Sequence, residues 1–235
     1  MDLLGRINSY QFESIYDLGC GTGNITKIIH DKWPNSSVTG VDSSEEMLGK
    51  AKTDYKEIKW ELADLNIWEP TIQPDLLFSN ATLHWLDDHK SLFPRLMKIL
   101  PSGGLLAIQM PNNYKSPSHS CILDTILSRE WGADLEKIYR YQPVLNPSEY
   151  HQILESISSE VWIWETTYWH VLEGANPVVQ WTKGSALRFY LELLSPKLAS
   201  DFELEYSKRI YDAYRPINGK TYFPFRRLFM VAIAN

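Results

Sequence analysis

The apolar positions of the first 110 residues form short continuous runs, and these alternate with stretches in which apolar residues follow a helical period. Ser43, with Glu46 at the capping-box spacing, is expected to cap the helix after the second run. Strands that alternate with helices in this way are typical of a doubly wound, mostly parallel α/β sheet. The expected strands lie at 14–18, 38–41, 59–63, 76–79 and 105–110.

The second half of the chain changes character, with proline-rich and helical segments around two further strands. The expected elements are a helix near 118–130, a helix at 147–157, a strand at 161–167, a helical stretch at 174–216 broken at Pro177, Gly184 and Pro196, and a last strand at 229–233. We expect residues 1–235 to form a single domain. Its segments 111–146 and 174–220 are expected to fold over the sheet as helical lid insertions.

The composition, 44% hydrophobic and 22% charged, is that of a globular protein and excludes disorder, collagen and coiled coils. The net charge of −6 argues against nucleic acid as a partner, and no apolar run reaches the ~20 residues that span a bilayer. Two cysteines are too few for a disulfide framework. We expect a cytoplasmic monomer or weak homodimer, with no membrane partner. The 13% aromatic content indicates large core residues or an aromatic-walled pocket.

A glycine-rich stretch, 17–24, lies between the first expected strand and the first expected helix. Its glycines, Gly19, Gly21 and Gly23, permit positive φ and allow the backbone to approach a ligand closely. A tight turn that binds nothing is the alternative. Asp42, which follows Gly23 by 19 residues at the end of the second strand, favours a ligand, because an acid there accepts the hydroxyls of a ribose.

The glycine spacing distinguishes two kinds of ligand. Dinucleotide sites use G-x-G-x-x-G, whereas this chain has G-x-G-x-G after the acidic Asp17. A carboxylate facing the loop repels a pyrophosphate and attracts an ammonium group. The loop therefore favours an adenosyl group joined to a cationic amino acid over NAD.

The stretch 17–24 resembles the first motif of class I S-adenosylmethionine-dependent methyltransferases, and later marks are similar to the trans-aconitate 2-methyltransferase family over nearly the whole chain. The resemblance implies a seven-stranded Rossmann-like methyltransferase sheet. It also implies S-adenosylmethionine as cofactor, S-adenosylhomocysteine as its product, and no metal. Matches to the wider superfamily continue at Asp42, 63–65, 79–81 and 101–104. The marks of the narrower family are 33–34, 39–44, 83–86, 92–94, 108–112 and 227–229.

The resemblance assigns roles at the cofactor. Asp17 faces the methionine part, Asp42 binds the ribose hydroxyls, and Asp64 accepts from the adenine amino group. A surface acid is the alternative for Asp64, and a helix core residue is the alternative for Met47. The implied cofactor residues are Asp17, Gly19, Gly21, Gly23, Asn24, Asp42, Ser43, Met47, Ala63, Asp64, Leu65, Asn80 and Ala81.

The implied reaction is esterification of one carboxylate of a small polycarboxylic acid, trans-aconitate first. A carboxylate is already ionised near pH 7 and needs no general base, which agrees with the absence of a Ser–His–acid set or a metal-ligand spacing. Arginine can bind a carboxylate through two hydrogen bonds, although a solvated or salt-bridged surface position is the alternative for either arginine. The candidate acceptor residues are His84, Trp85, Tyr168, Arg188 and Arg227, and His170 and Trp181 also match the family's pattern.

Other functions stay open at this point. The first alternative is a methyltransferase for another acid, such as a malonyl thioester. The net charge of −6 counts against docking of the carrier protein that would hold this thioester. Family members carry chain ahead of Leu3 that helps to cover the cofactor, and we expect this segment to be missing here. A protein that binds the cofactor without catalysis is therefore the second alternative. A nicotinamide dehydrogenase and a nucleic-acid methyltransferase are disfavoured.

Overall fold

The computed structural model describes residues 2–132, 134–140 and 143–235, and the chain divides into two compact units. The first unit consists of Met1–Pro111, Pro143–Thr166 and Leu228–Asn235, and the second consists of Asn112–Gln142 and Thr167–Arg227. The chain therefore crosses between the units four times, and two of these crossings lie inside strands.

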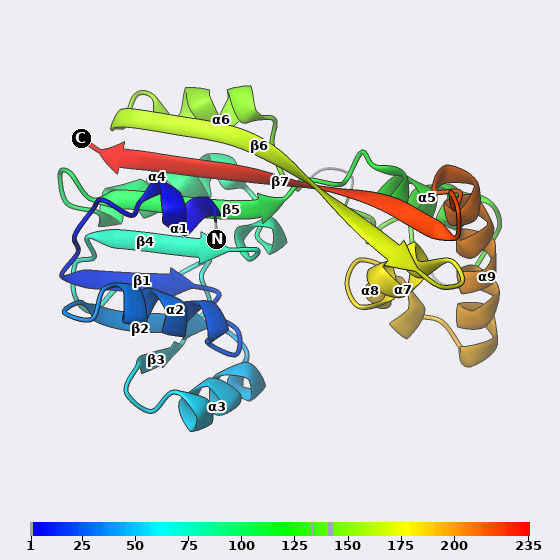
Figure 1. Ribbon diagram of the computed structural model, residues 1–235, viewed down its shortest axis with the longest axis horizontal. Coiled ribbons are helices and arrows are strands. Elements are labelled where there is room, and N and C mark those ends of the chain that lie inside the picture. Colours follow the sequence, from blue (N-terminus) through cyan, green and yellow to red (C-terminus); the bar gives the residue numbers. More distant parts are fainter. Residues whose placement is uncertain (1, 133, 141–142) are drawn as a thin grey trace. The chain divides into compact units, whose positions relative to one another are not determined.

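A seven-stranded sheet has the order β3-β2-β1-β4-β5-β7-β6 (Figure 1). The pairs β1–β2, β2–β3, β1–β4 and β4–β5 are parallel, and the order reverses between β1 and β4. The expected α/β, doubly wound and mostly parallel sheet is confirmed. Its strands are β1 (Ser14–Leu18), β2 (Ser37–Asp42), β3 (Lys59–Leu62), β4 (Leu76–Asn80), β5 (Leu105–Pro111), β6 (Ser158–Glu173) and β7 (Lys220–Ala234).

The central strands of the sheet are buried on both faces. Every residue of β1 is buried, as are all residues of β4 and β5 except the last of each. This explains why these strands read as continuous apolar runs rather than as alternating patterns. The buried hydroxyl of Ser79 donates to the carbonyl of Leu18 at 2.9 Å and joins the carboxyl ends of β4 and β1.

Helices connect the parallel strands of the first unit. One expectation about them is wrong, because Ser44 rather than Ser43 caps α3: its hydroxyl accepts from the N–H of Met47 at 3.3 Å. The Ser44 N–H donates to Asp42 Oδ1 at 2.8 Å, and this turn keeps Ser44 extended, so the helix begins one residue later. The helical elements are α1 (Asp2–Arg6), α2 (Asn24–Lys32), α3 (Glu45–Asp54), the 3₁₀ helix η1 (Leu83–Trp85), α4 (His89–Ile99) and α6 (Pro147–Leu154).

The second unit has its own apolar core. The expected breaks are confirmed, since α7 begins at Pro177 and is capped by Gly184, and α9 begins at Pro196. None of the helices in the described part of the chain is long and apolar enough to cross a membrane. The helices of this unit are α5 (Pro117–Leu127), α7 (Pro177–Lys183), α8 (Arg188–Glu192) and α9 (Pro196–Ala213).

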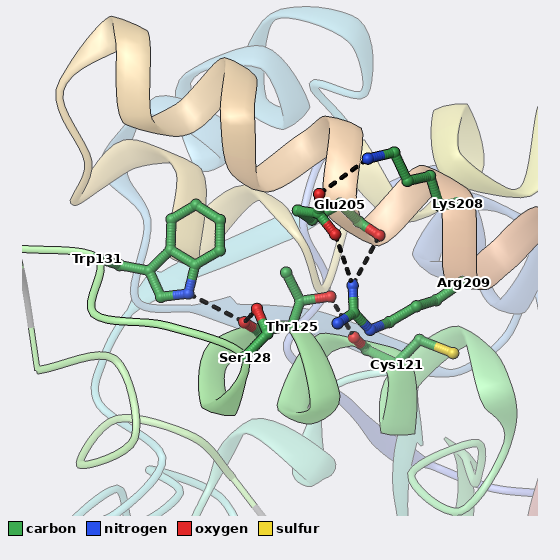
Figure 2. A network of polar contacts seen from close by, with 7 residues as sticks. All are labelled: Cys121, Thr125, Ser128, Trp131, Glu205, Lys208 and Arg209. Carbon is green, nitrogen blue, oxygen red and sulfur yellow. Dashed lines mark hydrogen bonds and ion pairs between the residues drawn. The ribbon is translucent and has the colours of Figure 1, made fainter.

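The end of α5 is tied to the loop that follows it (Figure 2). The indole of Trp131 and the hydroxyl of Ser128 both donate to the carbonyl of Thr125, at 2.9 and 2.8 Å. The Trp131 ring also packs edge-on against Phe202 of α9, 4.8 Å away. The two hydrogen bonds therefore hold the loop against the end of α5, and the ring contact joins the loop to α9.

The last two strands are longer than expected. Strands were expected at 161–167 and 229–233, but β6 has 16 residues and β7 has 15. Both continue into the second unit, where β6 alternates between exposed and half-buried residues instead of forming an apolar run. Pro224 lies inside β7, and a proline in a strand argues against a continuous strand when only the sequence is read.

Candidate functional site

The glycine loop follows β1 at the carboxyl end of the sheet, next to the point where the strand order reverses. Gly19, Gly21 and Gly23 have φ values of 75°, 56° and 82°, which side chains with a Cβ rarely adopt. The N–H groups of Gly19 and Cys20 donate to the carbonyl of Val41 at 2.7 and 3.0 Å. The loop is thus bound to the end of β2.

The three glycines meet different surroundings. A Cβ on Gly19 would lie 2.0 Å from Cγ2 of Thr82, and one on Gly23 would lie 2.4 Å from the ring of Trp60. A Cβ on Gly21 would meet no atom within 4 Å. The loop therefore packs against protein at both ends and is open in the middle, where its backbone is accessible to a ligand.

Asp42 shapes this open middle. Its Oδ2 accepts from the N–H of Gly21 and its Oδ1 from the N–H of Ser44, both at 2.8 Å. An ionised carboxylate offers about four acceptor positions, so about two remain on this half-buried group. Asp42 consequently fixes the loop and keeps acceptors for further donors.

Asp17 lies inside the first unit, against α2. Its side chain is 1% exposed, and Oδ2 accepts from the hydroxyl of Thr26 at 2.6 Å. Burial raises the pKa of Asp17 to about 7; the hydrogen bond from Thr26 works against this rise and the charge of Asp42 adds to it. Asp17 thus joins β1 to the start of α2 through Thr26. Its contact with a cofactor stays a prediction.

The end of β4 lies beside the loop. Ala81 has a positive φ of 57°, and its N–H donates to the carbonyl of Gln109 at 2.9 Å. The hydroxyl of Thr82 donates to the carbonyl of Gly19 at 3.0 Å, which joins this segment to the loop. Asn80 and Ala81, both half-buried, are therefore at the end of the sheet where the loop lies.

His84 and Trp85 follow in η1 with very different exposure. The ring of His84 is buried, 6% exposed, whereas Trp85 is 45% exposed. The ring centroids lie 4.6 Å apart. Of the two expected acceptor residues, Trp85 offers the larger accessible surface.

The remaining expected cofactor residues surround the ends of β2 and β3. Met47 is 41% exposed, so it is not a core residue of α3. Leu65 is only 6% exposed, which leaves little of its side chain for a ligand. The exposed Asp64 accepts from both nitrogens of Asn66 at 2.9 Å through Oδ1. Half-buried Ala63 and exposed Ser43 and Asn24 complete this set.

A methyltransferase-domain family model matches residues 15–104, the part of the chain that contains the loop. Trans-aconitate 2-methyltransferase of Azoarcus sp. strain BH72 is 40% identical over 233 residues, 99% of this chain and 91% of that one. The Agrobacterium fabrum enzyme of the same name is 37% identical over 238 residues, with the same coverage. The chain belongs to the trans-aconitate 2-methyltransferase family.

Solved structures with lower identity share the fold. A Haemonchus contortus phosphoethanolamine N-methyltransferase bound to S-adenosylhomocysteine matches 99% of this chain and 51% of its own, with a TM-score of 0.59 and 17% identity. The plantazolicin methyltransferase BpumL, also bound to S-adenosylhomocysteine, matches the whole chain and 80% of its own, with a TM-score of 0.54 and 17% identity. This member of the trans-aconitate 2-methyltransferase family thus has the methyltransferase fold.

In the second unit, the structure brings two of the expected acceptor residues together. The guanidinium of Arg227 on β7 lies 5.5 Å from the ring of Tyr168 on β6 and 5.4 Å from the ring of Phe225. These are cation–π distances, and the rings hold the guanidinium in a defined orientation.

His170 lies on the same strand as Tyr168, among aromatic rings. Its ring is 4.6 Å from Trp181 of α7 and 6.2 Å from Phe225. Among the described residues, its Nε2 is buried without a hydrogen-bond partner. A buried donor or acceptor without a partner is costly, which makes this nitrogen a candidate for a ligand contact.

Arg188 occupies a different environment in α8. Its Nε donates to Glu192 Oε1 at 2.6 Å, one helical turn away, and its side chain is 68% exposed. In this trans-aconitate 2-methyltransferase family member, Arg188 thus forms an ion pair within its own helix, whereas Arg227 lies against aromatic rings.

Two residues at the loop, Trp60 and Thr82, were missed by the sequence analysis. They occupy the space next to Gly23 and Gly19. The only sequence signal for such a partner is the glycine itself, and the glycine does not say which distant side chain fills the space.

Proposed function

We propose that this chain transfers the methyl group of S-adenosylmethionine to a carboxylate oxygen of trans-aconitate or a closely similar small polycarboxylate. The observation that carries the proposal is the glycine loop, which is packed at Gly19 and Gly23 and open at Gly21, at the carboxyl end of a methyltransferase sheet. The names of the relatives at 40% and 37% identity support the choice of acid.

The chain's own groups fit this cofactor. The open backbone at Gly21 suits the amino-acid part, and the remaining acceptor positions of Asp42 suit the ribose hydroxyls. The exposed side chain of Met47 suits the adenine ring, and the exposed carboxylate of Asp64 suits its amino group. When bound, S-adenosylmethionine supplies a sulfonium methyl group, and its S–C bond breaks as the carboxylate oxygen forms the new C–O bond.

The protein's task in this reaction is to orient the acid. The acceptor carboxylate is ionised near pH 7, so no residue has to remove a proton from it. Alignment of the reacting atoms is then the main source of the rate.

Recognition of the remaining carboxylates is assigned to the second unit. Arg227, oriented by Tyr168 and Phe225, offers a planar donor pair for a carboxylate. The buried Nε2 of His170 offers a further donor when it carries the proton.

The proposal includes the setting of the reaction. Cys20 and Cys121 are both free and buried, which suits the reducing cytoplasm. We propose a monomer or weak homodimer that needs neither nucleic acid nor a membrane.

Product analysis tests the function directly. The purified chain is incubated with methyl-deuterated S-adenosylmethionine and, separately, trans-aconitate, cis-aconitate, citrate or a malonyl thioester, and the products are identified by mass spectrometry. We expect a labelled mono-ester of trans-aconitate, with kcat/KM at least about tenfold above that of the other acids. Transfer to the thioester alone would contradict the acid, and binding of S-adenosylhomocysteine without any transfer would favour a non-catalytic binding protein.

A further inference from the structure

One row of residues crosses the sheet beneath the glycine loop. Asp17 of β1 is in register with Gly40 of β2, and Gly40 is in register with Trp60 of β3. Residues in register in a parallel sheet point to the same face. Because Gly40 has no side chain, the ring of Trp60 occupies its place: a Cβ on Gly40 would lie 2.4 Å from Cζ3 and 2.6 Å from Cε3 of that ring.

The ring of Trp60 also fills the space next to Gly23, at the end of the glycine loop. A Cβ on Gly23 would lie 2.4 Å from Cη2 of Trp60. The Sγ of Cys20 is 3.0 Å from the point where a Cβ of Gly40 would be, so the thiol and the ring both border the space over Gly40. One side chain from β3 therefore fills the space at Gly23 and Gly40, and Cys20 borders the second of these spaces.

The ring itself is held in place. Trp60 Nε1 donates to the carbonyl of Tyr55 at 3.1 Å, and the hydroxyl of Tyr55 donates to Asn24 Oδ1 at 3.0 Å. Asn24 is the first residue of α2, directly after Gly23. These hydrogen bonds join the end of α3, β3 and the start of α2 around the loop.

We propose that Trp60 is a positioning residue for the glycine loop, and that its ring sets the distance of the loop backbone from β2. The inference rests on the proposed function, which places the cofactor on this loop. Thr82 holds the loop at Gly19 and Asp42 holds it at Gly21, so Trp60 supplies the third support, at Gly23. Without the ring, the space over Gly40 is empty and the second half of the loop loses its support.

Trp33 provides a matched control. It is a buried tryptophan of the first unit, and its Nε1 also donates to a backbone carbonyl, that of Tyr10, at 3.0 Å. It follows α2 and precedes β2, at the opposite end of the strands from the loop. Trp33→Leu therefore removes a comparable indole while leaving the loop untouched.

The experiment compares Trp60→Leu, Trp60→Phe and Trp33→Leu with the parent chain. One readout is the rate at which Cys20 reacts with an alkylating reagent, followed by peptide mass spectrometry so that Cys121 is counted separately. Burial raises the pKa of the Cys20 thiol, so the parent rate is low. The second readout is the Kd of S-adenosylhomocysteine by calorimetry.

We expect Trp60→Leu to speed Cys20 alkylation and to weaken S-adenosylhomocysteine binding, each by about tenfold or more, since a tenfold change needs only about 1.4 kcal/mol. Trp60→Phe keeps an aromatic ring, so its alkylation rate and its Kd should lie between those of Trp60→Leu and the parent. Trp33→Leu should lower the melting temperature but leave both readouts within about twofold.

An alkylation rate in Trp60→Leu that equals that of Trp33→Leu would overturn the proposal. Faster alkylation with an unchanged Kd would overturn it too, because the binding geometry would then not depend on the ring. A parent chain that binds no S-adenosylhomocysteine contradicts the proposed function instead, and the alkylation rates still decide whether Trp60 holds the loop.

Discussion

Asp17 shows how a single buried side chain can link the site to solution conditions. Its carboxyl is almost fully enclosed and accepts a hydrogen bond from the hydroxyl of Thr26. Burial raises the pKa of Asp17 to about 7, so the folded protein holds this proton far more tightly than an unfolded chain does. A proton bound preferentially by the folded state stabilises that state at low pH.

The resulting prediction concerns stability between pH 5 and pH 8. The contribution of Asp17 is fully present below pH 4 and is lost as the pH rises to about 7, because ionisation of the buried carboxyl is unfavourable. Asp17→Asn keeps an acceptor for Thr26 and cannot ionise. From pH 5 to pH 8, the free energy of unfolding of the parent, measured with urea, should fall by about 2 kcal/mol relative to that of Asp17→Asn. Parallel pH profiles for the two proteins would show that Asp17 does not titrate in this range.

At the scale of elements, the pairing of β2 with β3 depends on a missing side chain. Gly40 lies in the middle of β2 with no positive φ, so its conformation alone does not require glycine. The requirement comes from its neighbour across the pair, because the Trp60 ring fills the position of a Cβ. The requirement for glycine at this position is therefore set by Trp60, which is 20 residues away in the sequence.

Gly40→Ala should therefore destabilise the protein by about 1–3 kcal/mol through overpacking. Gly49→Ala is the control: Gly49 is exposed inside α3 with no atom near its Cβ position, and alanine there should stabilise by about 0.5–1 kcal/mol. Both changes are measured by urea unfolding. In a Trp60→Leu background the cost of Gly40→Ala should fall; an equal cost in both backgrounds would mean that the ring is not the obstacle.

Elements differ in how far their sequence determines them. The buried strands β1, β4 and β5 were predictable because their partners impose a continuous apolar run. The outer parts of β6 and β7 were not, since they lie in another unit and Pro224 interrupts the pattern. The cap of α3 was missed by one residue, because both Ser43 and Ser44 are good capping residues and the local hydrogen bond from the Ser44 N–H to the Asp42 side chain decides between them.

At the scale of the whole molecule, the proposed roles divide between the units. The glycine loop and Asp42 belong to the first unit, while Arg227, Tyr168 and His170 belong to the second. Cofactor affinity and acid affinity should therefore respond to different substitutions. Two adjacent residues of β7 allow this division to be tested, because neighbours along a strand point to opposite faces.

Arg227→Gln should raise KM for trans-aconitate by about 10- to 100-fold, the equivalent of a charge-assisted hydrogen bond of about 1.5–3 kcal/mol. The Kd of S-adenosylhomocysteine should stay the same. The control is Arg226→Gln, an exposed neighbour whose backbone rather than side chain bonds to Asn113. If steady-state kinetics show equal effects for the two variants, the assignment of Arg227 to the acid is wrong.

The candidate site was also predictable in part. The glycine spacing and the acid at Asp42 follow local rules of backbone freedom and strand order, and these can be read along the chain. The pairing of Arg188 with Glu192 depends on the rotamers of two side chains in one helix, and the enclosure of Asp17 depends on packing across elements. The supporting roles of Trp60 and Thr82 arise only when distant segments meet.

The four crossings of the chain between its units have a practical consequence for protein engineering. The second unit is made of two separate stretches, and two of its borders, Thr166–Thr167 and Arg227–Leu228, fall in the middle of β6 and β7. A chimaera that borrows this unit from a relative must therefore exchange both stretches at once and splice each strand without shifting its register. A one-residue slip at either splice would turn every following side chain of that strand to the opposite face of the sheet.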